Sequence, residues 1–219
     1  MSIEKINAAK KALEFVKPDT VIGLGSGSTV FEFLKLLGEK IRNENMRVFG
    51  VPTSFDTEMI ALGQGIPIIR PDQPPKIDLA IDGADLISKN YLIKGGGGAL
   101  TREKIIAYEA EKFYVIADEG KLKLENFPVP IEVIPFSVFL VAKKLQQKGY
   151  QVMLRMSQNK LGPVITDNGN YIIDALIPKI NNPKKLEEEL TLIPGVIENG
   201  IFTKFDKIII GNQKGSKIL

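Results

Sequence analysis

The chain has 219 residues, of which 44% are hydrophobic and 25% charged, a composition typical of a globular protein with a sizeable core. It contains no histidine, cysteine or tryptophan, which excludes a Ser-His-Asp triad, a cysteine nucleophile, a zinc site of Cys and His, and dithiol redox chemistry. The net charge of +3 is small and the lysines are scattered, so neither nucleic acid nor a membrane surface is expected as a partner. The start of the chain is too polar for a signal peptide, and no apolar run reaches the roughly 18 residues of a membrane span, so we expect a cytoplasmic protein.

The first 130 residues alternate expected helices and buried strands. Apolar residues at helical spacing predict an opening helix from Ile6 to Val16 and a second helix from Val30 to Ile41. A third helix, capped by Thr53 or Ser54, ends near Leu62, and a proline-rich connection follows. This alternation predicts a doubly wound, mostly parallel α/β sheet domain. The remaining expected elements are strands over 20–24, 48–51, 66–69, 77–81 and 113–117, a helix over 101–111 and the connection from Pro71 to Pro75.

From Val129 the pattern changes to that of a smaller α+β domain. Strand-like segments and two helices follow one another in a split β-α-β order, similar to a ferredoxin-like domain. Asn168-Gly169, within Thr166-Asp167-Asn168-Gly169-Asn170, predicts a two-residue hairpin loop between short strands. We therefore predict an α/β catalytic domain over 1–130 plus 206–219, with the smaller domain over 131–205 inserted into it. The expected elements are strands over 131–134, 150–155 and 196–202, helices over 136–147 and 183–190, and a returning strand over 208–211.

A glycine-rich segment joins the first expected strand to the second helix. Gly23-Leu24-Gly25-Ser26-Gly27-Ser28-Thr29 offers backbone N–H groups, a helix N-terminus and three hydroxyls, which suit a phosphate. The dinucleotide fingerprint is excluded because Ser28 stands where its last glycine is required, and a P-loop because its lysine is missing, since Thr29 is followed by Val30. A tight turn without a ligand is the alternative interpretation.

Two carboxylates follow the strand at 77–81. Asp82-Gly83-Ala84-Asp85 lies at the carboxyl end of that strand, where open α/β sheets bind ligands. Solvated acids in an Asx-type turn and a Mg²⁺ site are the alternatives for such a short motif.

The segment from Lys94 to Lys104 contains four consecutive glycines, Gly95 to Gly98. Glycines lose much backbone entropy on folding, which favours a loop that must approach a ligand closely. Lys94 supplies a cation, and Glu103 lies in the first turn of the next helix, although a surface lysine and a helix-dipole acid would fit the same pattern. With Asp82 and Asp85 they form an acid–base set without histidine.

These motifs together resemble the ribose-5-phosphate isomerase family of the A type. The similarity extends over nearly the whole chain and includes the 166–170 turn and Ile193-Pro194-Gly195-Val196 with Gly200 and Phe202. It implies an α/β domain with a smaller α+β domain, and interconversion of D-ribose 5-phosphate and D-ribulose 5-phosphate without a cofactor or metal. It also implies a homodimer or homotetramer whose only other partner is a small sugar phosphate.

The resemblance assigns roles to particular residues. Glu103 matches the catalytic base, Asp82 and Asp85 the paired acids, and Lys94 the lysine before the glycine run. Leu86 stands where the family commonly has an acid and Ser26 where it commonly has Thr, and both changes leave the reacting groups intact. The implied substrate-binding residues are Ser26, Gly27, Ser28, Thr29, Asp82, Gly83, Ala84, Asp85, Lys94, Gly95, Gly96, Gly97, Lys121 and, more weakly, Lys5.

Aldose–ketose isomerisation needs one base to move a proton between C2 and C1, and groups that stabilise an enediolate and open the sugar ring. The hypothesis is that Glu103 moves the carbon-bound proton and Lys94 stabilises the oxyanion. Asp82 and Asp85 serve ring opening and hydroxyl proton transfer, and the sequence does not assign these two roles between them. The alternatives are a non-catalytic sugar-phosphate sensor, a related sugar-phosphate deaminase or lactonase, and a metal-assisted hydride shift. Many of those deaminases and lactonases use histidine, which is absent here.

Overall fold

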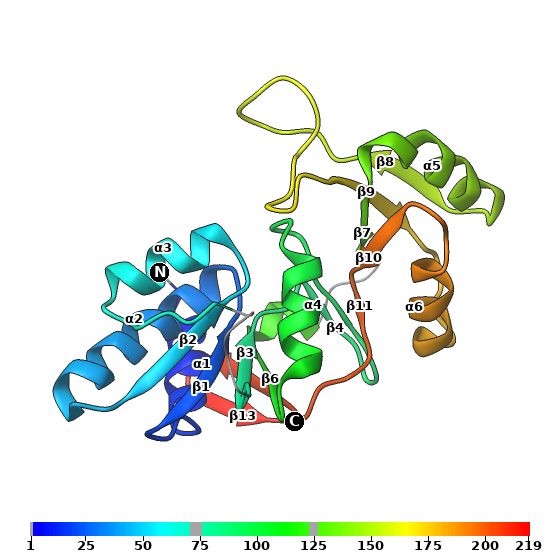
Figure 1. Ribbon diagram of the computed structural model, residues 1–219. Coiled ribbons are helices and arrows are strands. Elements are labelled where there is room, and N and C mark those ends of the chain that lie inside the picture. The colour runs from blue at the N-terminus through cyan, green and yellow to red at the C-terminus, as the bar shows by residue number, and fades with distance from the viewer. Residues whose placement is uncertain (1, 71–75, 123–126) are drawn as a thin grey trace. The chain divides into compact units, whose positions relative to one another are not determined.

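The structure is a computed structural model that describes residues 2–70, 76–122 and 127–219, so the expected connection at 71–75 lies outside the described residues (Figure 1). The described residues form two compact units. Unit 1 combines the segments Met1–Ala84, Arg102–Lys121 and Lys204–Leu219, and unit 2 combines Asp85–Thr101 and Leu122–Thr203. No described helix is both long enough and apolar enough to cross a membrane.

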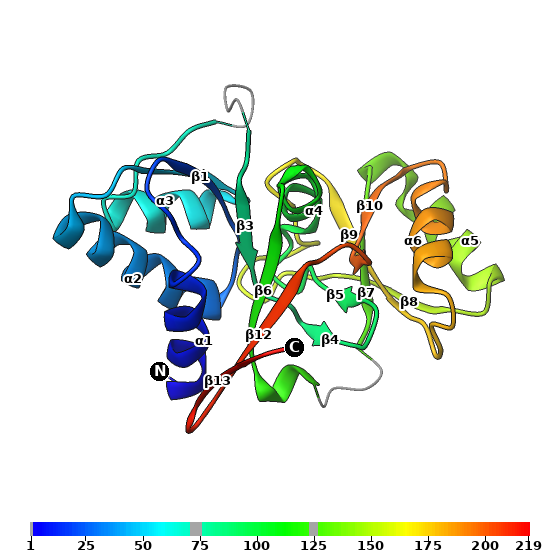
Figure 2. The same ribbon diagram turned by 90° about the horizontal axis from the view of Figure 1, so that it is seen from below.

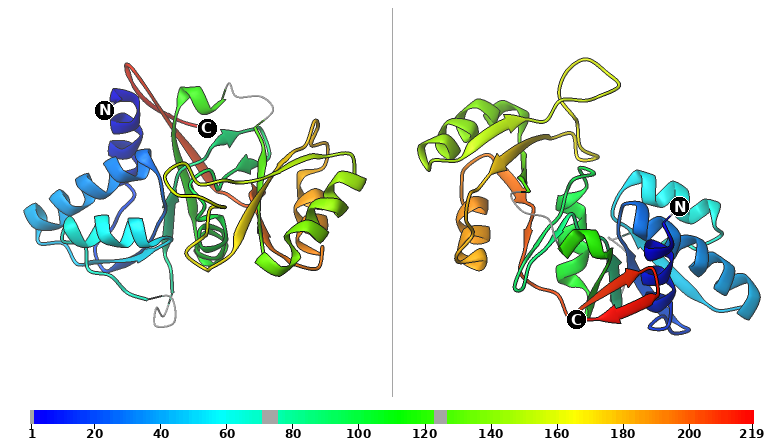
Figure 3. Two further views of the ribbon diagram at one scale, coloured as in Figure 1. Left: turned by 90° about the horizontal axis from the view of Figure 1, so that it is seen from above. Right: turned by 180° about the vertical axis from the view of Figure 1, so that it is seen from behind.

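Unit 1 is built on a six-stranded sheet with the strand order β13-β12-β6-β3-β1-β2. All neighbouring pairs are parallel except the C-terminal hairpin of β12 and β13 (red in Figure 3), which the sequence did not lead us to expect. The strands are β1 (Thr20–Leu24), β2 (Val48–Pro52), β3 (Leu79–Asp82), β6 (Phe113–Asp118), β12 (Lys207–Asn212) and β13 (Gly215–Ile218).

Helices cover both faces of this sheet (Figure 2). Ile22 and Leu24 belong to the same buried cluster as residues of α1, α2 and α3. Gly23, between them, faces the other way, where a Cβ would overlap the side chain of Ile106 on α4. The doubly wound α/β class is thereby confirmed. The helices are α1 (Ile3–Leu13), α2 (Ser28–Glu44), α3 (Phe55–Gly63) and α4 (Leu100–Glu109), and the 3₁₀ helix η1 (Glu119–Leu122) follows β6.

Unit 2 contains a four-stranded antiparallel sheet with the order β10-β7-β9-β8. In chain order the elements run β7, α5, β8, β9, α6, β10, and both helices pack on one face of the sheet (Figure 3). This is the expected ferredoxin-like arrangement. The elements are β7 (Val129–Val133), η2 (Pro135–Ser137), α5 (Val138–Gln147), β8 (Gln151–Leu154), β9 (Tyr171–Leu176), α6 (Pro183–Thr191) and β10 (Val196–Asn199).

A small antiparallel sheet completes unit 2. Its strands are β4 (Leu86–Ile87), β5 (Leu92–Ile93) and β11 (Ile201–Phe202), in the order β11-β5-β4. Because β5 pairs with β11, and β7 pairs with β9 and β10, residues 85–101 and 122–130 group with unit 2, whereas the predicted domain division starts the smaller domain at 131.

Three local predictions were wrong. Residues 66–69 form no strand, because only Ile68 makes a β-bridge, to Gly50. The expected strand over 196–202 is two strands in two sheets, β10 and β11, separated at Gly200. The 166–170 turn encloses three residues, since Thr166 N donates to Asn170 O and Gly169 adopts a φ of +79°, and no strand precedes it.

Candidate active site

The glycine-rich loop of unit 1 is held by the first aspartate of the Asp82-Gly83-Ala84-Asp85 motif. Asp82 ends β3, next to β1, and its Oδ1 accepts hydrogen bonds from Ser26 N at 3.0 Å and Gly83 N at 2.7 Å. Gly25 N donates to Ile81 O, and a Cβ on Gly25 would overlap the Asp82 carboxyl group. Adjacent parallel strands therefore bring the predicted loop and the first acid together at the carboxyl edge of the sheet.

A cluster of buried hydroxyls supports the same loop from behind. The Ser26 hydroxyl lies 2.9 Å from Thr53 Oγ1, and Thr57 Oγ1 donates to Gly25 O at 2.8 Å. Ser54 caps α3 by accepting from Thr57 N. The sequence predicts only that Thr53 or Ser54 caps a helix, and no periodic signal marks the cluster.

The loop ends at the N-terminus of α2. Gly27 precedes the helix with a φ of +97°, a conformation that favours glycine. Lys5, on α1, donates from Nζ to Ser28 Oγ at 2.7 Å, so one predicted cation lies at the first residue of α2. A helix N-terminus with an adjacent ammonium group suits an anion.

Glu103 and Lys121 occupy other elements of unit 1. Glu103 lies in the first turn of α4 and is 5% exposed. Lys121 lies in η1 beyond the end of β6, and β3 separates β6 from β1 in the sheet. A buried carboxylate of this kind can exchange protons with a ligand while water is excluded.

In unit 2 the second aspartate is joined to the glycine run. Asp85 Oδ2 accepts a hydrogen bond from Gly96 N at 2.7 Å, and a Cβ on Gly96 would lie 2.7 Å from Asp85 Oδ1. Gly98 N donates to Gly95 O, closing a turn in which Gly95 and Gly98 have φ values of +103° and +86°. At these positions the loop requires glycine for its backbone conformation or for the close approach of Asp85.

Lys94 is a buried lysine at the head of this loop. Its side chain is 2% exposed, and its Nζ lies 5.4 Å from the centre of the Phe202 ring, within cation–π range. Its backbone N–H donates to Gly200 O, so the antiparallel pairing of β5 with β11 continues by one hydrogen bond to Lys94. The surface-lysine interpretation of Lys94 is therefore excluded.

The two aspartates are linked by the chain itself. Asp82 belongs to unit 1 and Asp85, three residues later, to unit 2. An extended chain advances at most about 3.6 Å per residue, so their Cα atoms lie within about 11 Å of each other.

Arg155 is a loop contact that sequence analysis missed. Its Nη1 donates to Gly95 O at 2.8 Å and Gly96 O at 3.0 Å, while Nε and Nη2 donate to the two carboxylate oxygens of Asp174. This bidentate pair is mostly buried, with side-chain exposures of 16% and 13%. Arg155 therefore fixes the carbonyl side of the glycine loop, and Asp85 fixes its amide side.

We expect Arg155→Met to lower the free energy of unfolding by about 2 kcal/mol, because it removes charge-assisted hydrogen bonds and leaves Asp174 without its cation. Urea unfolding measures the change. Arg47→Met is the matched control: Arg47 also pairs with an aspartate, Asp19, but both side chains are exposed, so the loss there should stay below about 1 kcal/mol. Equal losses in the two variants would contradict the prediction.

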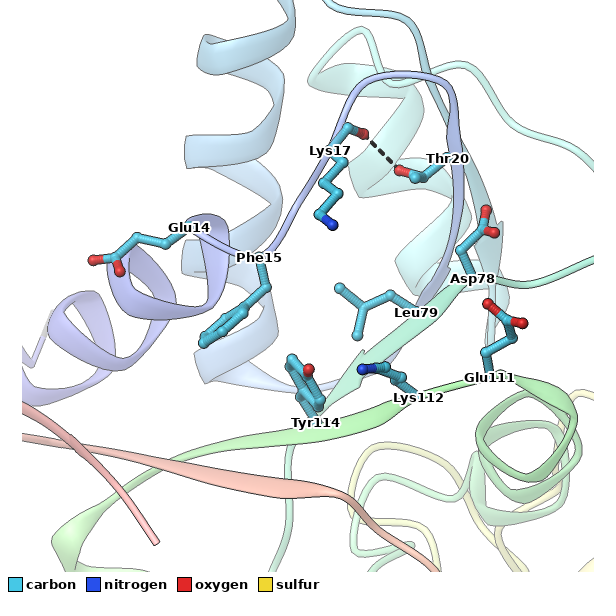
Figure 4. Close-up of a pocket in the computed structure, with 9 residues that line it drawn as sticks. All are labelled: Glu14, Phe15, Lys17, Thr20, Asp78, Leu79, Glu111, Lys112 and Tyr114. Carbon is cyan, nitrogen blue, oxygen red and sulfur yellow. Dashed lines mark hydrogen bonds between the residues drawn. The ribbon is translucent and has the colours of Figure 1, made fainter.

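A pocket of about 420 Å³ lies at the opposite edge of the unit 1 sheet, at the amino ends of β1, β3 and β6. Lys17 and Lys112 point into it in Figure 4. It is thus separate from the loop at 25–29. The residues that line this pocket are Glu14, Phe15, Lys17, Thr20, Asp78, Leu79, Glu111, Lys112 and Tyr114.

The described residues contain no group of three or more Asp or Glu side chains arranged to hold a metal ion.

Known proteins match the chain over both units. A family model described as Ribose 5-phosphate isomerase A (phosphoriboisomerase A) matches residues 49–215. The curated Ribose-5-phosphate isomerase A of Methanococcus aeolicus is 49% identical over 98% of this chain and 94% of its own length. The structure of ribose 5-phosphate isomerase A from Methanocaldococcus jannaschii is 48% identical, with a TM-score of 0.95 over 98% of this chain and 97% of that one.

A further solved structure is that of a D-ribose-5-phosphate isomerase in complex with phospho-erythronic acid. It is 49% identical, with a TM-score of 0.96 over 100% of this chain and 99% of that one. The resemblance inferred from the motifs is thereby confirmed, and this chain belongs to the ribose 5-phosphate isomerase A family.

Proposed function

We propose that this protein interconverts D-ribose 5-phosphate and D-ribulose 5-phosphate by carboxylate-mediated proton transfer through an enediolate, a reaction of the non-oxidative pentose phosphate pathway. The observation that carries the proposal is membership of the isomerase family over almost the entire chain. The ligand of one relative, phospho-erythronic acid, is a sugar-acid phosphate, whose carboxylate carries the negative charge that an enediolate also bears.

Glu103 is the proposed base. In the open-chain aldose its carboxylate takes the proton from C2, the electron pair of that C–H bond forms the C1–C2 double bond, and the C1 carbonyl oxygen becomes an oxyanion. The same group returns the proton to C1 while the proton of the C2 hydroxyl is transferred to the C1 oxyanion, so that C2 becomes the carbonyl and C1 the hydroxymethyl carbon of the ketose. The burial of Glu103 supports this role, because a carboxylate shielded from water exchanges its proton with substrate in preference to solvent.

Lys94, Asp82 and Asp85 are the proposed supporting groups. The buried ammonium of Lys94 stabilises the oxyanion as it forms. Asp82 and Asp85 move protons between the ring oxygen and the hydroxyl groups, and each is already oriented by a backbone N–H bond in the structure. Gly83, Ala84 and Gly95 to Gly97 provide close-approaching backbone around the sugar.

The phosphate is assigned to the loop Ser26 to Thr29 with Lys5 and Lys121. The N-terminus of α2 carries the partial positive charge that an anion prefers. The hydrogen bond from Lys5 to Ser28 supports the assignment, since a phosphate oxygen could accept from both groups.

An isomerase assay with ribose 5-phosphate tests the proposal directly. Turnover is expected, whereas binding without turnover would favour a sugar-phosphate sensor. Conversion of an amino-sugar phosphate or a lactone in place of ribose 5-phosphate would favour the deaminase or lactonase.

Chelation separates proton transfer from a metal-assisted hydride shift. Because the proposed reaction uses carboxylates and a lysine only, prolonged dialysis against EDTA should leave kcat unchanged within error. The control is the same dialysis followed by added Mg²⁺ or Mn²⁺. Loss of activity that either ion restores would contradict carboxylate-only catalysis.

We further propose a cytoplasmic homodimer or homotetramer. Exposed apolar side chains on η2 and α5 support assembly: Phe136 is 92%, Phe139 83% and Leu140 61% exposed. Light scattering should give a mass of two or four chains, and Phe139→Asp should lower it. A monomeric parent protein would refute the assembly.

A further inference from the structure

Glu132 is a charged residue in the middle of the apolar strand β7. Its neighbours Ile131 and Val133 belong to the buried cluster under α5 and α6. Because successive side chains of a strand alternate, Glu132 points to the other face of the sheet, where it is 0% exposed. A carboxylate buried this completely destabilises a fold unless several donors solvate it.

Four side chains of unit 2 act as those donors. Thr101 Oγ1 lies 2.5 Å from Glu132 Oε2. On Oε1, Thr166 Oγ1 donates at 2.9 Å, Asn168 Nδ2 at 3.1 Å and Asn170 Nδ2 at 2.8 Å. The Thr166 oxygen itself accepts the backbone N–H groups of Asn168 and Asn170, so its own hydrogen is directed to the carboxylate. Glu132 therefore acts as an acceptor toward every one of these partners.

These contacts join two segments that are more than 60 positions apart in the sequence. One is the 166–170 turn, to which no function was assigned. The other is Thr101, the second residue of α4, which lies three positions after Gly98, the last glycine of the run, and two positions before Glu103. The Glu132 carboxylate is thus hydrogen-bonded to both segments.

We propose that Glu132 is a positioning residue for the isomerase reaction, holding Thr101 and thereby fixing the first turn of the helix that carries Glu103. The inference rests on the proposed function. In an α-helix, residues 101 and 103 are separated by two residues of rise, about 3 Å along the axis. Because the helical backbone between them is rigid, a shift of Thr101 also displaces Glu103. Displacement of a catalytic group by about 1 Å can reduce a rate by about 100-fold.

A purely structural role makes a different prediction. Loss of stability reduces the fraction of folded enzyme but leaves kcat per folded molecule and KM unchanged. A positioning role lowers kcat of the folded enzyme more than it changes KM, since substrate binding uses groups that remain in place.

The experiment compares two pairs of variants at a temperature where circular dichroism shows every variant folded. Glu132→Gln replaces one acceptor oxygen by an NH₂ group that faces other donors. Glu187→Gln makes the same change at another buried glutamate of unit 2, which lies on α6 and accepts a hydrogen bond from Thr203 Oγ1 at 2.6 Å. Thr101→Val removes the hydroxyl, and Thr101→Ser restores it.

We expect Glu132→Gln and Thr101→Val to lower kcat by about tenfold, with KM changed less than about threefold. Thr101→Ser should recover most of kcat, and Glu187→Gln should lower the melting temperature but not kcat. Equal kcat values in Glu132→Gln and Glu187→Gln would overturn the inference. If Glu132→Gln fails to fold, equal kcat in Thr101→Val and Thr101→Ser would overturn it. A parent enzyme without isomerase activity would instead refute the proposed function, and this inference with it.

Discussion

Glu103→Gln is expected to lower kcat for ribose 5-phosphate isomerisation by about 10⁴-fold while KM changes less than about threefold. The amide is almost the same size as the carboxylate but cannot accept a proton from carbon. The chain has no histidine or cysteine that could replace it as a base. Because the side chain is 5% exposed, water has little access to take over the transfer.

The matched control is Glu109→Gln, the same substitution at the last residue of the same helix, where kcat should stay within about twofold of the parent. Turnover is followed by ribulose 5-phosphate formation, and proton transfer separately by exchange of the C2 hydrogen in D₂O. Near-normal kcat in Glu103→Gln would refute the assignment, and retained exchange without product would move its role to a later step.

Gly25→Ala should lower kcat by about 100-fold, because its methyl group would occupy the volume of the Asp82 carboxyl group. Asp82 would have to rotate and lose its bonds from Ser26 N and Gly83 N. The same movement should destabilise the protein by about 2 kcal/mol, since the site is buried and tightly packed.

Gly63→Ala is the control for this substitution. Gly63 ends α3, no atom lies within 4 Å of its added Cβ, and its φ is not positive. Alanine there should leave kcat unchanged and raise helix stability slightly. Steady-state kinetics and urea unfolding of both variants measure the effects. A Gly25→Ala enzyme with parental kcat would show that the position of Asp82 does not limit the reaction.

Much of the architecture was predictable from local patterns. The strand at 20–24 agrees with β1 residue for residue, because a short apolar run bounded by turn residues can only be buried. The helix–strand alternation predicted the doubly wound sheet, and the changed rhythm after Val129 predicted the ferredoxin-like arrangement. These signals are local, so one sequence is sufficient to detect them.

The errors occurred where pairing partners are distant. Residues 196–202 form one continuous strand pattern, yet Val196 pairs with Val133 and Ile201 with Ile93, in different sheets. The apolar run at 66–69 resembles a strand, but only Ile68 makes a β-bridge. Periodicity measures whether a segment can be buried and extended, and contains no information on which partner it meets.

The sequence by itself determined the chemical inventory: without imidazole or thiol, the side chains left for proton transfer are carboxylates, lysines and tyrosines, and the motifs from Asp82 to Glu103 contain carboxylates and a lysine at the ends of predicted elements. The sequence did not reveal that Arg155 contacts the glycine loop. Glu132 does stand out in the sequence, as a lone charge within the apolar run 129–133.

Only the tertiary structure decided what holds these groups in place. Arg155 reaches Gly95 across 60 positions of chain, and Glu132 reaches Thr101 across 31. Hydrogen bonds between such distant residues leave no periodic pattern in the sequence. They form because folding the antiparallel sheet of unit 2 buries these charged side chains beside backbone and hydroxyl groups that must satisfy them.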